Sequence, residues 1–275
     1  MVSRIANSFA AAAREKRPAV IPFVTAGDPD LSFTARLIPQ LAAAGADILE
    51  LGVPYSDPLA DGPTIQRASQ RALQSGTTVS GVLEAVSGAR QEGLKVPIVL
   101  LVYYNCIYRR GEERFAQEAA AAGVDGLVVP DLPLEEAGSL RQHARGAGLD
   151  LIPLVAPTST PERLALVGQV ASGFIYCVSL TGVTGARATL PPDLPEFLSR
   201  VRDASGGRVP LAVGFGVSTP DHAREVGRWA DGVIVGSALV SRMEQAASAA
   251  DKLQAAREFV ATLRSGSAQA AGMLT

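Results

Sequence analysis

Short apolar runs recur along the chain, and each is followed by a turn and then by a segment with helical periodicity. Such runs between turn signals are typical of buried strands, whereas apolar positions that repeat every three or four residues indicate amphipathic helices. The expected strands cover residues 19–25, 48–53, 97–103, 126–129, 151–155, 173–178, 210–213 and 232–235. The expected helices cover residues 3–16, 32–44, 64–74, 79–91, 112–122, 134–147, 161–170 and 194–204, a helix opened by Thr219 and Pro220, and two stretches within 238–263.

A short sequence recurs where helices give way to strands. It reads AGAD at residues 44–47, AGVD at 122–125 and AGLD at 147–150, and a shortened ADG stands at 230–232. Glycine can end a helix in the left-handed conformation, and here an aspartate opens the strand that follows. The repeating unit is therefore helix, glycine, aspartate, strand and turn.

Eight such strands with helices between them predict an α/β protein, a single (β/α)8 TIM barrel with an extra N-terminal helix. The barrel is expected to span residues 1–265, and residues 266–275 are expected to form a frayed C-terminal tail. A doubly wound open sheet is the alternative arrangement of alternating strands and helices. No GxGxxG motif follows the first strand, so the barrel is favoured.

Composition narrows the class of protein. With 275 residues the chain has the length of a one-domain α/β barrel, and its net charge of −2 gives no basic footprint for nucleic acid. No apolar run reaches the roughly 20 residues of a membrane span. The apolar stretch at 9–13 is followed at once by the charged residues 14–17, which argues against a secretory signal, so we expect a cytoplasmic protein.

The cysteines and histidines offer little chemistry. Cys106 and Cys177 form no disulfide framework and no metal-ligand cluster, and Cys177 lies in an apolar strand where packing is its expected role. His143 and His222 stand in polar helical segments, so both are expected at the surface.

Glu50 is the first candidate for catalysis. It interrupts the apolar run 48–53, and a carboxylate is costly to bury there unless it is paired, hydrogen-bonded or neutralised. Two-residue alternation places it on one strand face with Ile48 and Gly52. It is either a structural acid held by an arginine or by backbone amides, or a catalytic group with a perturbed pKa.

The loop after this strand is stiffened by Pro54, Pro58 and Pro63 and carries Asp57 and Asp61. Taken singly, Asp-Pro and Asp-Gly are common turn dipeptides. A rigid acidic loop directly after a strand that bears a glutamate is more typical of an active site. Asp61 is therefore the second catalytic candidate.

Three glycine-bearing turns follow the sixth, seventh and eighth expected strands, at residues 182–185, 214–216 and 236–237. TIM barrels often bind phosphate with the loops after strands seven and eight. Glycine lets an anion approach backbone N–H groups, and Ser237 opens a helix whose positive end favours negative charge. Together the turns predict a phosphate site.

Four stretches resemble one family, the tryptophan synthase alpha chain. They are LELGVPYSDPLADGPTIQ at residues 49–66, SLTGVTGAR at 179–187, VGFGVST at 213–219 and VGSALV at 235–240. The resemblance extends from the N-terminal helix to about residue 263.

The resemblance implies a cofactor-free lyase of tryptophan biosynthesis. Its reaction is the retro-aldol cleavage of indole-3-glycerol phosphate to indole and glyceraldehyde 3-phosphate. It also implies a partner, a pyridoxal-phosphate-dependent beta chain that consumes the indole in an alpha2beta2 heterotetramer.

The site residues follow from the resemblance by motif match. The catalytic carboxylates fall on Glu50 and Asp61, and the remaining implied positions have three roles. They are Phe23, Tyr176, Thr184 and Phe215 for substrate, Gly185, Gly216, Gly236 and Ser237 for phosphate, and Asp57 and Asn105 for the partner interface. Cys106 departs from the proline or leucine usual at its position, which bears on the shape of the partner-facing loop 104–110.

Other functions fit parts of the pattern. A different phosphate-sugar barrel enzyme, such as an isomerase or epimerase, shares the glycine turns but does not need the acidic loop. A stand-alone indole-3-glycerol phosphate lyase shares every motif. A non-catalytic barrel that only activates a partner is disfavoured, because both candidate carboxylates are present.

Overall fold

The computed structural model describes residues 3–178, 190–214 and 216–268. Its strands form one parallel sheet in the order β5-β4-β3-β2-β1-β9-β8-β7-β6. They are β1 (Ala19–Thr25), β2 (Leu49–Gly52), β3 (Ile98–Leu101), β4 (Gly126–Val128), β5 (Asp150–Ile152), β6 (Leu154–Val155), β7 (Ile175–Val178), β8 (Leu211–Gly214) and β9 (Gly232–Val235).

The fifth expected strand closes this sheet into a barrel. β5 pairs with β4 at one end of the strand order, and β6 pairs with β7 at the other. Only Pro153 separates the two in the chain, and its carbonyl oxygen accepts a hydrogen bond from the Tyr176 N–H at 2.9 Å. β5 and β6 are thus two halves of one strand position, and the predicted (β/α)8 barrel is confirmed.

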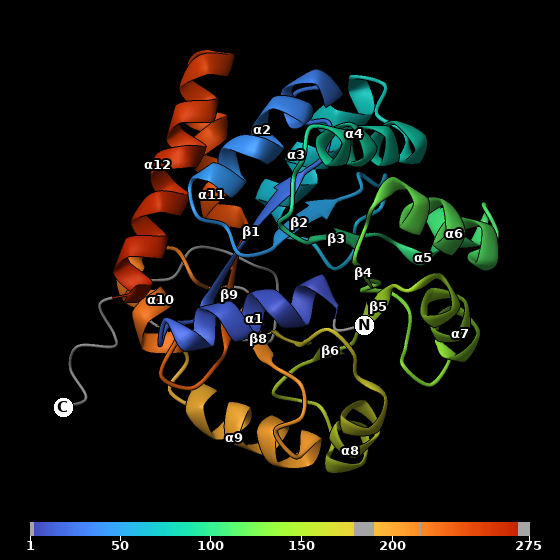
Figure 1. Cartoon of the computed structure of the whole chain (residues 1–275), viewed down its shortest axis with the longest axis vertical. Helices are drawn as coiled ribbons and strands as arrows, with labels where there is room; N and C mark the ends of the chain where they lie inside the picture. Colours follow the sequence, from blue (N-terminus) through green and yellow to red (C-terminus); the bar gives the residue numbers. More distant parts are fainter. Residues whose placement is uncertain (1–2, 179–189, 215, 269–275) are drawn as a thin grey trace.

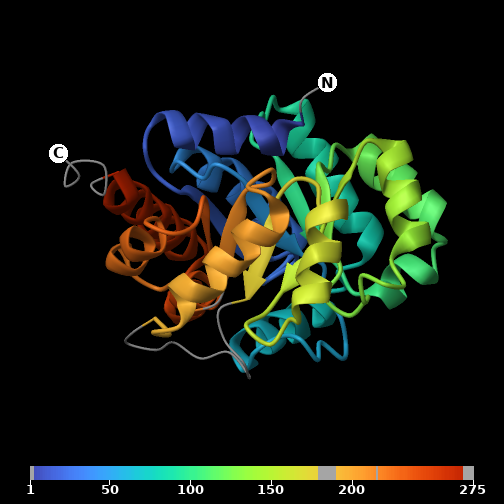
Figure 2. The ribbon, with the colours of Figure 1, turned by 90° about the horizontal axis from the view of Figure 1, so that it is seen from below.

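Helices surround the barrel (Figures 1 and 2). They are α1 (Arg4–Arg14), α2 (Leu31–Ala43), α3 (Pro63–Gln74), α4 (Val79–Gln91), α5 (Tyr104–Tyr108), α6 (Glu112–Ala122), α7 (Gly138–Ala147), α8 (Pro161–Val170), α9 (Leu194–Ser205), α10 (Pro220–Val226), α11 (Ser237–Gln245) and α12 (Ala249–Ala268). The stretch expected as a loop at 104–110 contains the short helix α5. The last helix runs to Ala268, past the expected start of the tail at residue 266.

The extra N-terminal helix α1 lies at the end of the barrel where the strands begin. Its Ile5, Phe9 and Ala12 are buried. The Phe9 ring lies 5.6 Å from the ring of Phe174, and it packs close to Gly232 at the first residue of β9. α1 therefore covers the amino-terminal end of the barrel, and the opposite, carboxyl end is left for loops.

An arginine–aspartate clamp fixes the start of β2. The Asp47 N–H donates to the Val20 carbonyl oxygen at 2.9 Å, and the Val20 N–H donates back to the Asp47 carboxylate at 2.8 Å. Arg17 binds both oxygens of that carboxylate, at 2.7 and 2.8 Å. Val20 lies in β1, so the clamp sets the position of the β2 segment against its neighbour.

The clamp recurs at two other strand starts, and in each case the aspartate belongs to the repeat seen in the sequence. At β4, Asp125 exchanges these hydrogen bonds with Ile98 and binds Arg90. At β9, Asp231 exchanges them with Leu211 and binds Arg202. At these three strand starts the aspartate thus completes the strand ladder at the amino-terminal end and forms an ion pair with an arginine, which belongs to a preceding helix in the cases of Arg90 and Arg202.

The expected burial of Cys177 and the expected exposure of the two histidines have different outcomes. Cys177 is fully buried in β7, as expected. His222 was expected at the surface but is only 8% exposed, because it stands beside Ala223 on α10, which packs against α12. His143 is partly exposed. Within the described ranges no helix combines the length and apolar character that a bilayer crossing requires.

Candidate active site

Glu50 lies in the middle of β2 and is completely buried. In register it stands between Phe23 of β1 and Val99 of β3. Neither carboxylate oxygen has a hydrogen-bond partner among residues 3–178, 190–214 and 216–268. Burial, and then the charge of Asp61, raise the pKa of Glu50 to about 8. The structural interpretation required an arginine or backbone amides around Glu50, and the described part of the chain provides neither.

Asp61 reaches the same region from the loop after β2. The Tyr103 hydroxyl donates to its carboxylate at 3.1 Å, and the same hydroxyl accepts a hydrogen bond from the Ala60 N–H at 3.1 Å. Burial raises the pKa of Asp61 to about 6, although the hydrogen bond from Tyr103 opposes this shift. At neutral pH Glu50 is therefore mainly protonated and Asp61 mainly ionised.

Tyr103 is absent from the sequence-predicted site. It holds the acidic loop in place, although 42 residues separate it from Asp61. Its position as the last residue of the expected third strand, 97–103, was the available signal, since side chains at the carboxyl ends of barrel strands face the active site.

Phe23 and Tyr176 occupy space that glycines leave open. A Cβ atom at Gly52 would lie 2.6 Å from the Phe23 ring, and one at Gly214 would lie 2.4 Å from the Tyr176 ring. Burial, followed by the charges of Glu50 and Asp61, raises the pKa of Tyr176 well above its usual value. The two predicted substrate residues within the described ranges thus stand close to the carboxyl ends of β2 and β8.

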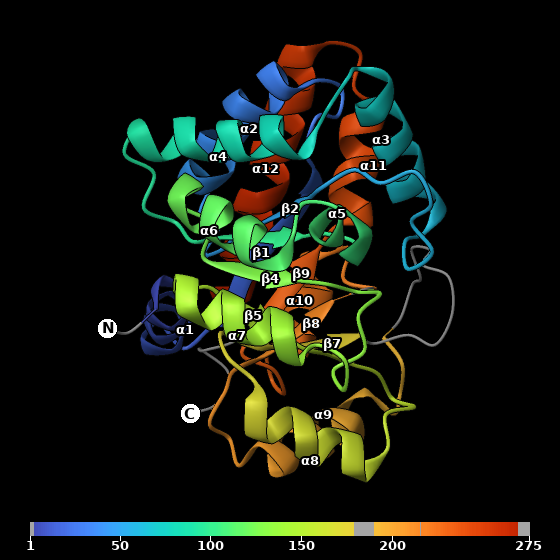
Figure 3. The ribbon, with the colours of Figure 1, turned by 90° about the vertical axis from the view of Figure 1, so that its right-hand side faces the viewer.

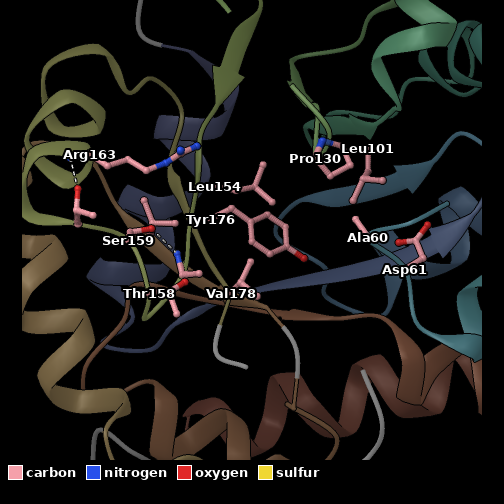
Figure 4. Close-up of a pocket in the computed structure, with 13 residues that line it drawn as sticks. Ala60, Asp61, Leu101, Pro130, Leu154, Thr158, Ser159, Arg163, Tyr176 and Val178 are labelled. Atoms are coloured by element: carbon pink, nitrogen blue, oxygen red, sulfur yellow. Dashed lines mark hydrogen bonds between the residues drawn. The ribbon is translucent and has the colours of Figure 1, made fainter. Parts of the chain in front are cut away.

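A cavity of about 490 Å³ opens beside Tyr176 and Asp61. Figure 4 shows Tyr176 at its centre, with the hydroxyl on the side of Ala60 and Asp61. Thr158, Ser159 and Arg163 lie on the opposite side. The wall between them is apolar and includes Leu101, Pro130, Leu154 and Val178. An apolar chamber with a carboxylate at one edge suits a flat aromatic ring that carries a polar N–H.

The predicted phosphate residues are described only in part. Gly216, with φ of +86°, follows β8, and Gly236 caps α11, whose first residue is Ser237. A Cβ atom at Gly236 would lie 3.2 Å from the Phe23 ring, so this helix start adjoins the aromatic part of the site. The positions of Thr184, Gly185 and Phe215 lie outside the described residues.

The two residues predicted to face a partner, Asp57 and Asn105, are exposed. The Asn105 side chain donates to the Tyr55 hydroxyl at 3.3 Å, and the Tyr55 ring stacks on Tyr103 at 4.9 Å. The loops after β2 and β3 are therefore linked through the residue that holds Asp61. Leu59, in the same acidic loop, is 94% exposed.

Within the described ranges no three side chains of His, Cys, Asp or Glu are close enough together to hold an ion.

Comparison with known proteins identifies the family. The sequence model of the tryptophan synthase alpha chain matches residues 9–269. The tryptophan synthase alpha chain of Citrifermentans bemidjiense is 52% identical over 265 residues, which cover 96% of this chain and 98% of the relative. That of Roseiflexus sp. is 50% identical over 263 residues, which cover 96% of this chain and all of the relative.

Solved structures agree in fold. The tryptophan synthase alpha subunit of Legionella pneumophila superposes with a TM-score of 0.89 at 38% identity, covering 97% of this chain and 98% of that one. A chain from Mycobacterium tuberculosis tryptophan synthase gives 0.88 at 39% identity, covering 97% and 99%. The chain therefore belongs to the tryptophan synthase alpha chain family.

Proposed function

We propose that this chain cleaves indole-3-glycerol phosphate to indole and glyceraldehyde 3-phosphate by a retro-aldol reaction. The observation that carries the proposal is Glu50, a fully buried carboxyl group with a pKa of about 8 and with no hydrogen-bond partner among the described residues. A protonated carboxyl group of this kind can donate a proton near neutral pH and take one back.

In the proposed reaction Glu50 first delivers its proton to C3 of the indole ring, which leaves positive charge on the ring nitrogen. The resulting carboxylate then removes the proton from the hydroxyl group on the carbon attached to C3. As the carbonyl group forms, the bond between that carbon and C3 breaks, and its electron pair returns to the ring. Indole and the aldehyde leave, and Glu50 is protonated again.

Asp61 has a different role in this scheme. Its lower pKa, about 6, keeps it mainly ionised while Glu50 is protonated. An ionised carboxylate that accepts the indole N–H stabilises the positive charge as it develops on the ring. Tyr103 donates to Asp61 and thereby fixes the direction of the carboxylate.

The substrate is held at both ends. Phe23 and Tyr176 contact the ring in the apolar chamber, together with Phe215. The phosphate binds the backbone N–H groups of Gly216, Gly236 and Ser237, and the motif match adds Gly185 to the phosphate residues and Thr184 to the substrate residues. Binding of the phosphate, remote from the bond that breaks, keeps C3 in register with Glu50.

The chemistry requires only proton transfers, so we propose that the chain uses no cofactor and no metal of its own. The pyridoxal phosphate of the pathway's next step belongs to the partner beta chain. We propose that Asp57 and Asn105 contact this partner in an alpha2beta2 heterotetramer, because both are exposed on the linked loops at the substrate entrance.

The direct test is to incubate the purified chain with indole-3-glycerol phosphate and to measure both products by chromatography. We expect equal amounts of indole and glyceraldehyde 3-phosphate, with a rate that EDTA does not change. If neither product forms, with or without a beta chain, the proposal is wrong and a different phosphate-sugar substrate must be sought. Chelator-sensitive turnover would contradict the metal-free mechanism.

A further inference from the structure

Two helices that begin at the proposed site are connected by an ionic network farther along their length. α3 starts at Pro63, two residues after Asp61, and α11 starts at Ser237. The two helices pack against each other, and Figure 3 shows them side by side. A change in their relative position would change the distance between the Asp61 carboxylate and the phosphate end of the site.

Arg71 of α3 is the centre of this network. Its Nε and one terminal nitrogen bind the two carboxylate oxygens of Asp28, at 2.8 and 2.7 Å. Its other terminal nitrogen binds Glu244 of α11 at 2.8 Å. Asp28 belongs to the segment between β1 and α2 and is 8% exposed. One guanidinium group therefore joins three separate parts of the barrel.

A second arginine reinforces the contact with α11. Arg67, one helical turn before Arg71, binds both oxygens of Glu244, at 3.1 and 2.9 Å. The hydrogen bond from Arg67, with further contributions from Arg71, lowers the pKa of Glu244 to about 2. Glu244 is therefore ionised at neutral pH.

The apolar contact surface of α3 is small. Its buried face consists of one large side chain, Ile65, and of the small residues Ala68, Ser69 and Ala72. Small side chains provide little apolar area for packing, so polar contacts carry a larger share of the attachment. At the start of the helix the Gln66 side chain donates to the Asp61 carbonyl oxygen at 2.9 Å, which ties the acidic loop to α3.

We infer that Arg71 is a positioning residue that holds α3, and with it Asp61, against α11. The inference rests on the proposed function, and it adds to that reaction a residue that does not touch the substrate. Arg71 acts through Asp61, whereas the phosphate contacts of α11 are local to its first turn.

The test is whether a substitution at Arg71 lowers the rate of turnover without lowering the affinity for phosphate. Arg71→Met should lower kcat for indole formation by roughly tenfold, because misplacement by a fraction of an ångström is costly in a preorganised site. Affinity for glycerol 3-phosphate, used as a probe of the phosphate end, should change less than about twofold. Arg71→Lys keeps the charge but not the forked geometry, and it should recover part of the lost kcat.

Additivity identifies the residue through which Arg71 acts. In an Asp61→Asn background, Arg71→Met should cost little further turnover, since coupled residues are not additive. The matched control is Arg114→Met, which removes an exposed pair with Glu118 on α6 and should leave kcat unchanged. If Arg71→Met does not fold, Glu244→Gln provides the same test from α11, with the same expected split.

Several results would overturn the inference. They are wild-type kcat in both Arg71→Met and Glu244→Gln, a loss of phosphate affinity as large as the loss of kcat, or full additivity with Asp61→Asn. A wild-type chain that makes no indole would instead overturn the proposed function, and the inference with it.

Discussion

At the scale of single residues, the protein buries a carboxyl group, Glu50, that has no hydrogen-bond partner in the part of the chain that the structure describes. Leaving such a group without a hydrogen-bond partner costs about 1–3 kcal/mol, even when it is neutral. Glu50 bears this cost inside a strand whose other residues are apolar or glycine. Destabilising groups of this kind are expected where their chemistry is used.

Glu50→Gln should therefore separate chemistry from folding. The amide is nearly isosteric but cannot transfer the proton, so indole formation should fall roughly 100- to 10,000-fold. Circular dichroism should show an unchanged fold. Glu92→Gln, at an exposed residue after α4, is the matched control and should have wild-type turnover. Turnover near wild type in Glu50→Gln would remove this residue from the mechanism.

Two carboxyl groups with separated pKa values also predict a pH profile. The active form has Asp61 ionised, which requires a pH above about 6, and Glu50 protonated, which requires a pH below about 8. A plot of log kcat/KM against pH should therefore be bell-shaped, with a maximum between these values. Asp61→Asn should lower the maximum and remove the acidic limb. A profile that keeps rising above pH 9 would contradict the role of Glu50 as the initial proton donor.

The raised pKa of Glu50 also affects the stability of the fold. The pKa of Glu50 is higher in the folded chain than its usual value of 4.5, so the folded state retains a proton that the unfolded state releases. The contribution of Glu50 to stability is present below pH 4.5 and is lost as the pH rises towards 8. In urea unfolding, the free energy of unfolding should therefore decrease less steeply with pH in Glu50→Gln than in the wild type. Equal slopes would contradict the raised pKa.

At the scale of elements, the sheet and most helices were predictable because each obeys a local rule. The apolar runs, the glycine caps and the strand-opening aspartates are all short-range signals, and β1, β9, α4, α6 and α8 have the predicted bounds. α5 was missed because its five residues contain no periodic pattern and no side chain caps it. The break at Pro153 was missed because it lies within an apolar run.

Only those site residues that belong to a single sequence motif could be predicted. Glu50 and Asp61 stand in one conspicuous stretch, and the glycines at strand ends follow a rule of the fold. The contact between Tyr103 and Asp61, and the network around Arg71, join segments that are distant in the sequence. Only the folded arrangement of β2, β3, α3 and α11 brings them together.

Gly236, the residue that caps the start of α11, provides a prediction at this scale. Gly236→Val would place a side chain against the Phe23 ring, since even a Cβ atom at this position would lie only 3.2 Å from it, and would crowd the proposed phosphate amides. KM should rise. Gly88→Val is the control, because a Cβ atom at Gly88 meets nothing within 4 Å. An unchanged KM in Gly236→Val would place the phosphate elsewhere in the barrel.

At the scale of the whole molecule, the two ends of the barrel have separate tasks. α1 and the three arginine–aspartate clamps lie at the end where strands begin. The carboxylates, the cavity and the exposed loops lie at the other. This division is usual for barrel enzymes, whose loops can change without loss of the core.

The exposed loops predict activation by the partner. Titration with a matching beta chain should raise the rate of indole formation, because docking on the linked loops after β2 and β3 would order the segment that bears Asp61. Asp57→Asn and Asn105→Ala should weaken this activation more than they weaken the basal rate. Glu92→Gln should change neither. Absence of co-elution and of any rate change would favour a stand-alone lyase.

The clamp at Asp47 has a consequence for the chemistry at the opposite end. Because side chains alternate along a strand, a slip of β2 by one residue would turn Glu50 out of the barrel and Leu49 or Leu51 into its place. Asp47 stands three positions before Glu50 and is joined to Val20 through both its N–H and its carboxylate. The paired hydrogen bonds with Val20, supported by the ion pair with Arg17, thus determine which side chain of β2 faces the proposed reaction. A contact at the amino-terminal end of the barrel thus sets the direction of the proposed proton donor near the other end.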